Sequence, residues 1–169
     1  MNSRQRVITS LNHKEPDQIP LDLASTPVSG ISYIAYNRYV ELLGRKEDNT
    51  LFDIIQQIIN PSERFLIEND VDTRAVRANS GAGFSIQLQE DEDYTFYYDE
   101  WGIGWRMPKT GGFYYDMAYH PLKDAVTEAD IDAYDKFLDT SDDARYAGMK
   151  ERAEEVYDAG YAVIVNSLS

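Results

Sequence analysis

The chain has 169 residues, of which 43% are hydrophobic and 12% aromatic, and this is enough for one domain with an apolar core. Its net charge of −14 disfavours nucleic acids and anionic membranes as partners, because both carry negative phosphate groups. The absence of cysteine excludes disulfides, thiol catalysis and cysteine-bound zinc within this chain, and it favours a reducing, cytoplasmic setting.

The first part of the chain alternates helical patterns with a short apolar run. A helix capped by Ser3 is expected to end before Pro16, because proline cannot continue a helix. Ile19–Leu23 then reads as a short buried strand. Helices are predicted over Ile31–Leu43, Leu51–Ile59 and Pro61 to about Glu68. The apolar face of the first of these should consist of Ile31, Ile34, Ala35, Leu42 and Leu43.

The middle of the chain has the alternating pattern of strands. Strands are expected over Val71–Ala78 and Phe84–Gln89, and the acidic run Glu90–Asp93 should form a solvated hairpin tip. The next three strands should form an antiparallel meander, over Tyr94–Tyr98, Ile103–Met107 and Phe113–Ala118. The basic N-terminus lacks the apolar region of a signal peptide, and no apolar run approaches the ~18 residues of a membrane helix.

The last part of the chain returns to helical patterns and ends in an apolar run. Thr127 is expected to begin a short helix. Ser141-Asp142-Asp143 should cap the longest helix, from about Asp143 to Asp158, which Gly160 ends. The apolar run Tyr161–Asn166 is typical of a fully buried strand in a parallel sheet.

Several familiar kinds of site are poorly supported. Both histidines lie close to prolines, no Gly-x-Ser-x-Gly elbow is present, and no histidine spacing is typical of zinc sites. Gly81-Ala82-Gly83 lacks the third glycine and the following helix of a dinucleotide site, and the Glu90–Asp93 run does not fit a calcium loop. The better candidates are polar residues at strand ends, where sites form in α/β folds: Asp22, Arg77, Asn79 and Asn166. Each has an alternative role as a turn or cap residue.

The segment Asp99–Gly112 contains both tryptophans and four of the ten glycines. Trp101 and Trp105 either fill the core of a hairpin or border a ligand site, and the sequence pattern leaves both roles open. Its residue types offer no acid–base or metal chemistry.

Seven segments resemble the uroporphyrinogen decarboxylase superfamily, and most closely its cobalamin-dependent methyltransferase branch, which includes the O-demethylase methyltransferases. They are Ser3–Val7, Leu11–Asp17, Ile19–Leu23, Gly30–Arg38, Asp99–Trp105, Asp116–Ala125 and Asp142–Arg145. The resemblance runs over essentially the whole chain. It implies an α/β fold, the N-terminal part of a TIM (β/α)8 barrel with an inserted antiparallel β-meander. Barrel elements would cover about residues 1–78 and 127–169, and the insertion about 84–118. A complete barrel needs ~250 residues or more, so the chain resembles the first half of a family member.

The resemblance also implies a function. The complete enzyme would move a methyl group between a small methylated substrate and a corrinoid protein. Zinc and a corrinoid (cobalamin) would serve the complete enzyme, with the zinc ligands in the later half and none on these residues. Asp22 and Asn79 would then be catalytic, and Arg77, Asn166, Trp101 and Trp105 would contact substrate. We expect no nucleic-acid or membrane partner, and a homo-oligomer or other self-association.

Two further hypotheses remain. The first is cofactor-free decarboxylation, as in uroporphyrinogen decarboxylase, although the arginine-rich motif of that branch is absent and Asn79 falls where its aspartate would lie. The second is a truncated, non-catalytic homologue that self-associates, because half a barrel leaves strand edges and an apolar sheet face open.

Overall fold

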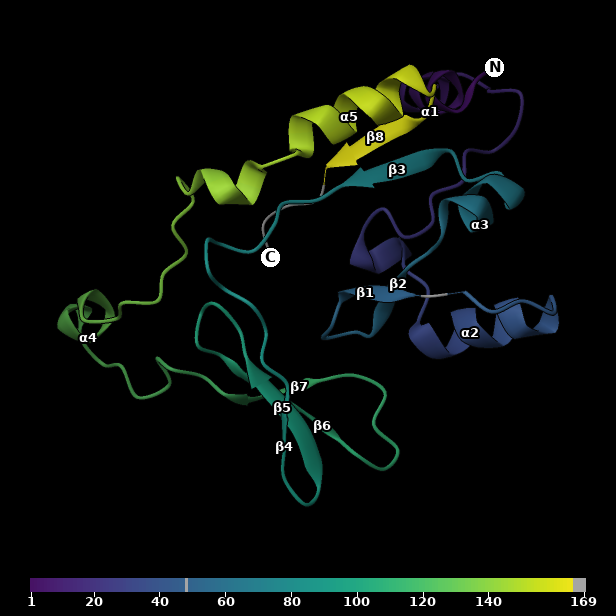
Figure 1. Cartoon of the computed structure of the whole chain (residues 1–169). Coiled ribbons are helices and arrows are strands. Elements are labelled where there is room, and N and C mark those ends of the chain that lie inside the picture. Colours follow the sequence, from purple (N-terminus) through teal and green to yellow (C-terminus); the bar gives the residue numbers. More distant parts are fainter. Residues whose placement is uncertain (48, 166–169) are drawn as a thin grey trace. The chain divides into compact units, whose positions relative to one another are not determined.

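The computed structural model describes residues 1–47 and 49–165, and it has a mixed α/β architecture (Figure 1). The chain divides into two compact units. The first unit consists of residues 1–53, 57–78 and 146–169, and the second of residues 54–56 and 79–145. The second unit is therefore longer than the expected insertion at 84–118, because it also includes the segment that follows the meander. The described strands form three separate small sheets and no closed barrel.

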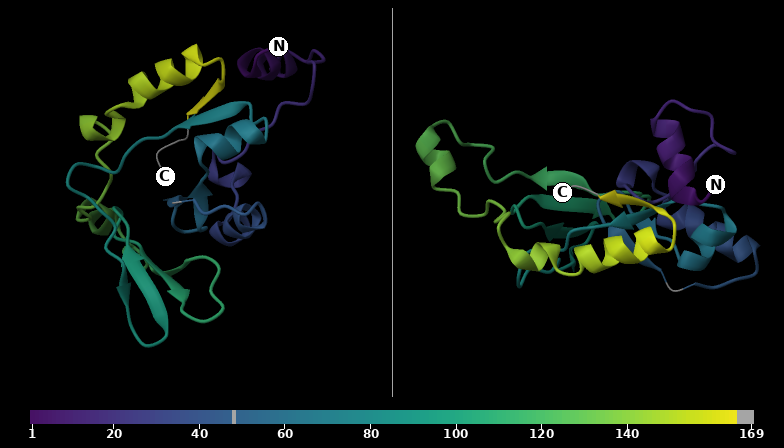
Figure 2. Two further views of the ribbon diagram at one scale, coloured as in Figure 1. Left: turned by 45° about the vertical axis from the view of Figure 1, so that its right-hand side comes forward. Right: turned by 90° about the horizontal axis from the view of Figure 1, so that it is seen from above.

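The first unit combines helices with two short strand pairs. Its elements are α1 (Ser3–Leu11), the 3-10 helix η1 (Pro27–Ser29), α2 (Tyr33–Leu42), β1 (Thr50–Asp53), β2 (Ile58–Asn60), α3 (Glu63–Glu68), β3 (Thr73–Val76), α5 (Met149–Asp158) and β8 (Ala162–Val165). Strands β1 and β2 are antiparallel, whereas β3 and β8 are parallel, with Thr73 opposite Ala162 and Val76 opposite Val165. Helix α5 contacts both strands of the parallel pair and runs beside them in all views (Figures 1 and 2). The parallel pairing predicted near the C-terminus is thus confirmed for the described residues, but the strand is not fully buried, since Val165 is 63% exposed.

The core of the first unit forms around α2. Tyr36, Val40, Ile59 and Phe65 are buried together, and the Tyr36 and Phe65 rings lie 4.8 Å apart. The Tyr36 hydroxyl donates a 2.6 Å hydrogen bond to Glu47 and accepts one from the Ser62 N–H. The apolar face predicted for this helix is wrong, since Leu42 is 84% exposed while Tyr36 and Val40 face the core.

The helix predicted over Leu51–Ile59 is also wrong, because this segment forms the β1–β2 hairpin. The apolar residues have helical spacing, but hydrogen bonds between this segment and the residues around the start of α2 determine its conformation. The Tyr33 N–H donates to the Gln57 carbonyl, and the Ile59 N–H donates to the Ile31 carbonyl. These bonds hold β2 beside the start of α2 and bury Ile58 and Ile59. A helix would leave those two partners unsatisfied.

The strand predicted at Ile19–Leu23 does not form, and Ile19 is 89% exposed. Pro20 has no N–H to give to a ladder. The Leu21 N–H donates to the side chain of Asp72, and the Leu21 carbonyl accepts from the Asp72 N–H. The segment is therefore held at Leu21 and, through the Thr73 hydroxyl, at Asp22, but it forms no strand.

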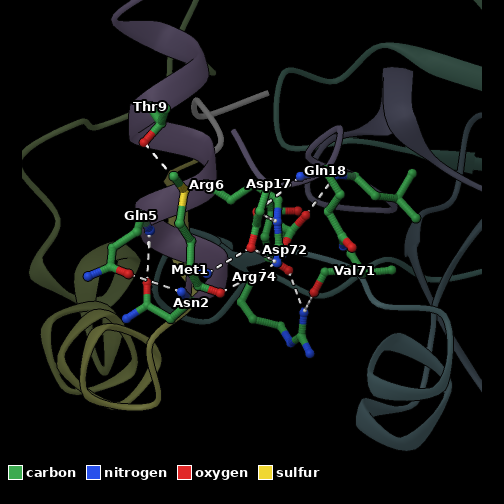
Figure 3. Close-up of polar contacts among 12 residues, drawn as sticks. Met1, Asn2, Gln5, Arg6, Thr9, Asp17, Gln18, Val71, Asp72 and Arg74 are labelled. Carbon is green, nitrogen blue, oxygen red and sulfur yellow. Dashed lines mark hydrogen bonds and ion pairs between the residues drawn. The ribbon is translucent and has the colours of Figure 1, made fainter. Parts of the chain in front are cut away.

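A buried carboxylate anchors the N-terminal part of the first unit (Figure 3). Asp72 accepts hydrogen bonds from Arg6 and from the Leu21 N–H. Arg6 also pairs with Asp17 at 2.8 Å. Helix α1 is capped by Asn2 and not by Ser3 as predicted, because the Asn2 side chain accepts from the Gln5 N–H at 2.8 Å in a capping box.

The second unit contains the meander. Its sheet has the order β4 (Gln89–Glu90), β5 (Tyr94–Tyr98), β6 (Gly104–Pro108) and β7 (Asp116–Tyr119), all antiparallel. The meander is confirmed, but of the strand predicted at Phe84–Gln89 only Gln89 forms part of β4, together with Glu90 from the predicted hairpin tip. Helix α4 (Glu128–Asp132) follows, capped by Thr127 as predicted.

The longest predicted helix, from Asp143 to Asp158, is interrupted. A 3-10 helix, η2 (Asp143–Tyr146), is followed by Gly148 at φ +80°, and α5 starts only after it. Gly148 is left-handed, so it ends one helical segment and begins the next. No helix among the described residues combines the length and apolarity that crossing a bilayer requires.

Candidate functional site

The first unit has a cavity of about 320 Å³ beside strand β3. Thr73, Ala75 and Arg77 line it, and they lie on one face because side chains alternate along a strand. The other lining residues come from the loop before η1, the segment that leads from β2 into α3, strand β3 and helix α5: Leu23, Ala24, Ser25, Asn60, Pro61, Glu63, Leu66, Arg74 and Arg152. Arg77, at the C-terminal end of β3, was predicted to contact substrate, and it lines this cavity.

Arg77 is held in place by its surroundings. Its guanidinium lies 3.8 Å from the centre of the Phe52 ring and donates to the Ala24 carbonyl. A second contact, to Asn60 Oδ1, is long at 3.4 Å. Burial, and then the charge of nearby Arg152, lowers the pKa of Arg77 from its usual value. The group still carries its charge at neutral pH, since an arginine titrates far above it.

Asp22 lies next to this cavity but does not line it. Its carboxylate accepts a hydrogen bond from the Thr73 hydroxyl, which in turn accepts one from the Ser25 hydroxyl at 2.7 Å. Partial burial acts to raise the pKa of Asp22, but hydrogen bonds from Ser25, Thr73 and Ser29 outweigh burial and lower the pKa below its usual value. Asp22 is therefore ionised at neutral pH. It fixes the orientation of the two hydroxyls that line the cavity.

We expect Asp22→Asn to destabilise the protein at pH 7 and to have a smaller effect in acid. Because its pKa is lowered in the folded state, the carboxylate stabilises the fold above its unfolded pKa of about 3.9. That contribution is lost as the pH falls through the folded pKa. Urea unfolding of both proteins at pH 7, 5 and 3.5 measures the difference. The matched control is Asp70→Asn, at an exposed residue with φ +52° that asparagine adopts readily. A difference in the free energy of unfolding between the unaltered protein and Asp22→Asn that stays constant from pH 7 to 3.5 would contradict the prediction.

The cavity has a local charge opposite to that of the whole chain. Arg74, Arg77 and Arg152 line it, whereas Glu63 is its one acidic lining residue among those described. Glu63 is engaged with Arg74, at distances of 2.8 to 3.0 Å. The cavity therefore suits an anion, with apolar walls from Leu23 and Leu66.

The other predicted site residues do not line this cavity. Asn79 lies in the second unit, where its N–H donates to the Arg145 carbonyl and its side-chain amide to the Ala144 carbonyl, at 2.9 and 3.1 Å. This is a tie between two loop segments. Asn166 lies outside the described residues. The structure thus brings Arg77 close to Asp22 in the chain, because Arg77 donates to the Ala24 carbonyl two residues after Asp22, and it describes Asn79 within the other unit.

Trp101 and Trp105 belong to the second unit and act there within the hairpin. The Trp105 indole N–H donates to Asp99 at 2.8 Å, and the same carboxylate accepts from the Ile103 N–H at 2.9 Å. Gly102, at φ +69°, closes this turn. The Trp101 ring meets Phe137 edge-on, with 6.3 Å between the ring centres. These contacts account for both rings by packing and hydrogen bonding.

The sequence did not indicate four lining residues that matter here: Ser25, Asn60, Thr73 and Arg152. Thr73 and Arg77 are both in the predicted strand with even spacing, so a shared face was a signal that could have identified Thr73. Ser25 and Arg152 carried no such signal. The sequence predicts a loop around Ser25 and a charged helix around Arg152, but neither pattern shows which side chains face a cavity. Among the described residues, no group of three or more His, Asp or Glu side chains is placed to hold a metal ion.

No protein-family model, curated protein or solved structure matches this chain.

Proposed function

We propose that this chain is the N-terminal part of a uroporphyrinogen decarboxylase-like enzyme that transfers a methyl group between a small methylated substrate and a corrinoid protein. The proposal rests on the resemblance of its sequence segments to the methyltransferase branch. The observation that carries the site is the cavity beside β3, which extends to Arg77 just past the C-terminal end of that strand, because substrates of α/β barrels bind at that end of the strands. In this proposal the described parallel pair β3–β8 would be adjacent barrel strands.

The residues of this chain would bind and orient the substrate. Arg77 would hold an anionic or polar group of it, and Asp22 would hold the hydroxyls of Thr73 and Ser25 toward the cavity. Zinc and the corrinoid would supply the chemistry of methyl transfer, as a Lewis acid and as a methyl carrier. The described residues do not fit a zinc site, because no cluster of ligands is present among them. No step is therefore assigned to zinc on this chain. The proposed setting is the cytoplasm.

The test uses the protein encoded by the whole reading frame that contains this chain, loaded with zinc. It is mixed with cob(I)alamin and a panel of methylated ethers, amines and thiols. Formation of methylcob(III)alamin, followed by absorbance, is the expected result, and Arg77→Gln should lower the rate. No methyl transfer with any donor or acceptor, with zinc present, would overturn the proposal.

A second candidate is cofactor-free decarboxylation of a polycarboxylated tetrapyrrole. The observation that favours it is the second arginine, Arg152, beside Arg77 in the cavity, because several carboxylates require several cations. Measured affinity for an acidic tetrapyrrole separates the two candidates. Tight binding together with release of carbon dioxide would favour the decarboxylase.

The third candidate is a non-catalytic homologue that self-associates, and it leads to a prediction on the 169-residue chain. We expect it not to elute as a monomer, because β3 and β8 are paired only with each other among the described strands, and Ile19, Leu42 and Val28 are 84–94% exposed. Size-exclusion chromatography with light scattering, at several concentrations, measures the mass. A sharp monomeric peak with cooperative unfolding would contradict this prediction.

A further inference from the structure

The cavity beside β3 gathers cations in a chain dominated by acids. Three of its twelve lining residues are arginines, although the chain has 30 acidic and only 16 basic residues. The local excess of positive charge is therefore not a property of the average surface. The partners of each arginine show whether it has a structural role or could bind an anion.

Arg74 is a structural residue. It is buried, makes a two-pronged ion pair with Glu63, and lies 3.8 Å from the centre of the Tyr161 ring. Its guanidinium also donates to the carbonyls of Val71 and Thr73, at 2.8 and 2.7 Å. Its charge is neutralised by Glu63 and four of its five N–H donors are engaged, so we assign it no role in binding a ligand.

Arg77 is not neutralised in this way. A guanidinium has five N–H donors, and the described residues accept from two of them, Ala24 strongly and Asn60 at 3.4 Å. Its Nε is buried and has no hydrogen-bond partner among the described residues, and no described carboxylate pairs with it. An unpaired buried donor costs about 1–3 kcal/mol. The group thus has both unused charge and unused donors.

Arg152 adds a second positive charge at the same cavity. It comes from helix α5, and its partner is Glu155 on the same helix, at 2.8 Å and exposed to solvent. Such a surface pair is weak and leaves the arginine free to turn toward another anion. Two cations that face one cavity repel each other, and an anion between them relieves the repulsion.

We propose that this cavity binds a small carboxylic acid, with its carboxylate between Arg77 and Arg152 and its organic part against Leu23, Pro61 and Leu66. A monoanion fits better than a doubly charged phosphate, because Arg152 already shares its charge with Glu155 and Glu63 lines the same cavity. The volume of about 320 Å³ lies at the small end of the ~300–1,000 Å³ of small-molecule sites. If the chain belongs to a methyltransferase as proposed above, binding of a carboxylate in this cavity predicts that the methylated substrate carries a carboxylate. This statement about the substrate class rests on the proposed methyl transfer.

The test measures binding to the chain without zinc, corrinoid or turnover, so its failure is separate from failure of the methyl-transfer assay. The probe is benzoate, with benzamide as its neutral analogue, titrated by calorimetry or ligand-observed NMR. We expect benzoate to bind about tenfold or more tightly than benzamide, as a charge-assisted pair with arginine requires. Arg77→Gln should weaken benzoate binding by about tenfold, and Arg152→Gln by a smaller factor.

The matched control is Arg64→Gln, which removes an exposed arginine that pairs with Glu68 on α3. Its affinity for benzoate should equal that of the unaltered chain. Circular dichroism checks that each variant is folded. If Arg77→Gln fails to fold, Arg77→Lys is used as well, because it keeps the positive charge but lacks the planar guanidinium group. Equal binding of benzoate and benzamide overturns the proposal. So does unaltered binding by both Arg77 variants, or saturation by inorganic phosphate at lower concentration than by benzoate.

Discussion

Asp72→Asn should lower the free energy of unfolding by about 1.5–3 kcal/mol, the contribution of hydrogen bonds to a buried charged group. The Asp72 side chain is 0% exposed and pairs with Arg6, whose side chain is only 12% exposed. The substitution keeps the shape and removes the charge, so it leaves the Arg6 guanidinium with Asp17 as its remaining described carboxylate partner, at the surface (Figure 3). Domains have only 5–15 kcal/mol of stability, so the loss would be a large share of the total.

Urea unfolding followed by circular dichroism at 222 nm measures this change. Asp70→Asn is the matched control, since it makes the same chemical change two residues away at an exposed position. Its unfolding midpoint should stay close to that of the unaltered protein. An Asp72→Asn midpoint that is equally unchanged would show that the Arg6 pair contributes little to the fold.

The sequence predicted elements well where local signals and tertiary contacts agree. Thr127 caps α4, the turn at Asp91–Asp93 connects two strands, and the three strands that follow it pair in the predicted antiparallel order. In each case the residues that define the element also satisfy its hydrogen bonds. The local pattern was sufficient there for the pairing order, although the strand predicted from Phe113 begins only at Asp116 and the Tyr115 N–H donates to the Ile55 carbonyl.

Prediction failed where a distant residue decides the conformation. Leu51–Ile59 has helical spacing, but the backbone of Gln57 and Ile59 bonds to residues before and within α2. Ile19–Leu23 has the composition of a strand, but its Leu21 N–H bonds to the Asp72 side chain 51 residues away. No local pattern encodes such partners. The same reason explains which site residues could be predicted. Arg77 was identified by its place at a strand end, whereas Arg152 lines the cavity only because of how α5 packs in the fold.

The second large effect concerns the pair Glu100–Arg145 in the second unit. Arg145 is 5% exposed, and it pairs with Glu100 at 2.9 Å while also donating to the Asp139 carbonyl. Glu100 in turn accepts from the Gly81 N–H at 2.6 Å. The pair therefore joins the segment that enters this unit, near Gly81, to the segment that leaves it, near Arg145.

Glu100→Gln should destabilise the second unit by about 3 kcal/mol, because a buried arginine then loses its carboxylate partner. Both tryptophans lie in this unit, so the tryptophan fluorescence transition in urea reports on it selectively. Glu90→Gln is the control, since Glu90 is exposed and its partner Lys109 lies 3.3 Å away. Its midpoint should be almost unchanged.

A double variant separates the ion pair from the other contacts of these residues. The double variant, Glu100→Gln with Arg145→Met, should lose less stability than the sum of the two single variants, because each single variant already removes the same ion pair. If the double variant were less stable than Glu100→Gln by the full effect of Arg145→Met, the two side chains would contribute independently. The junction would then be held by the backbone bonds at Asn79 and by the Asp142 bond to the Ala82 N–H.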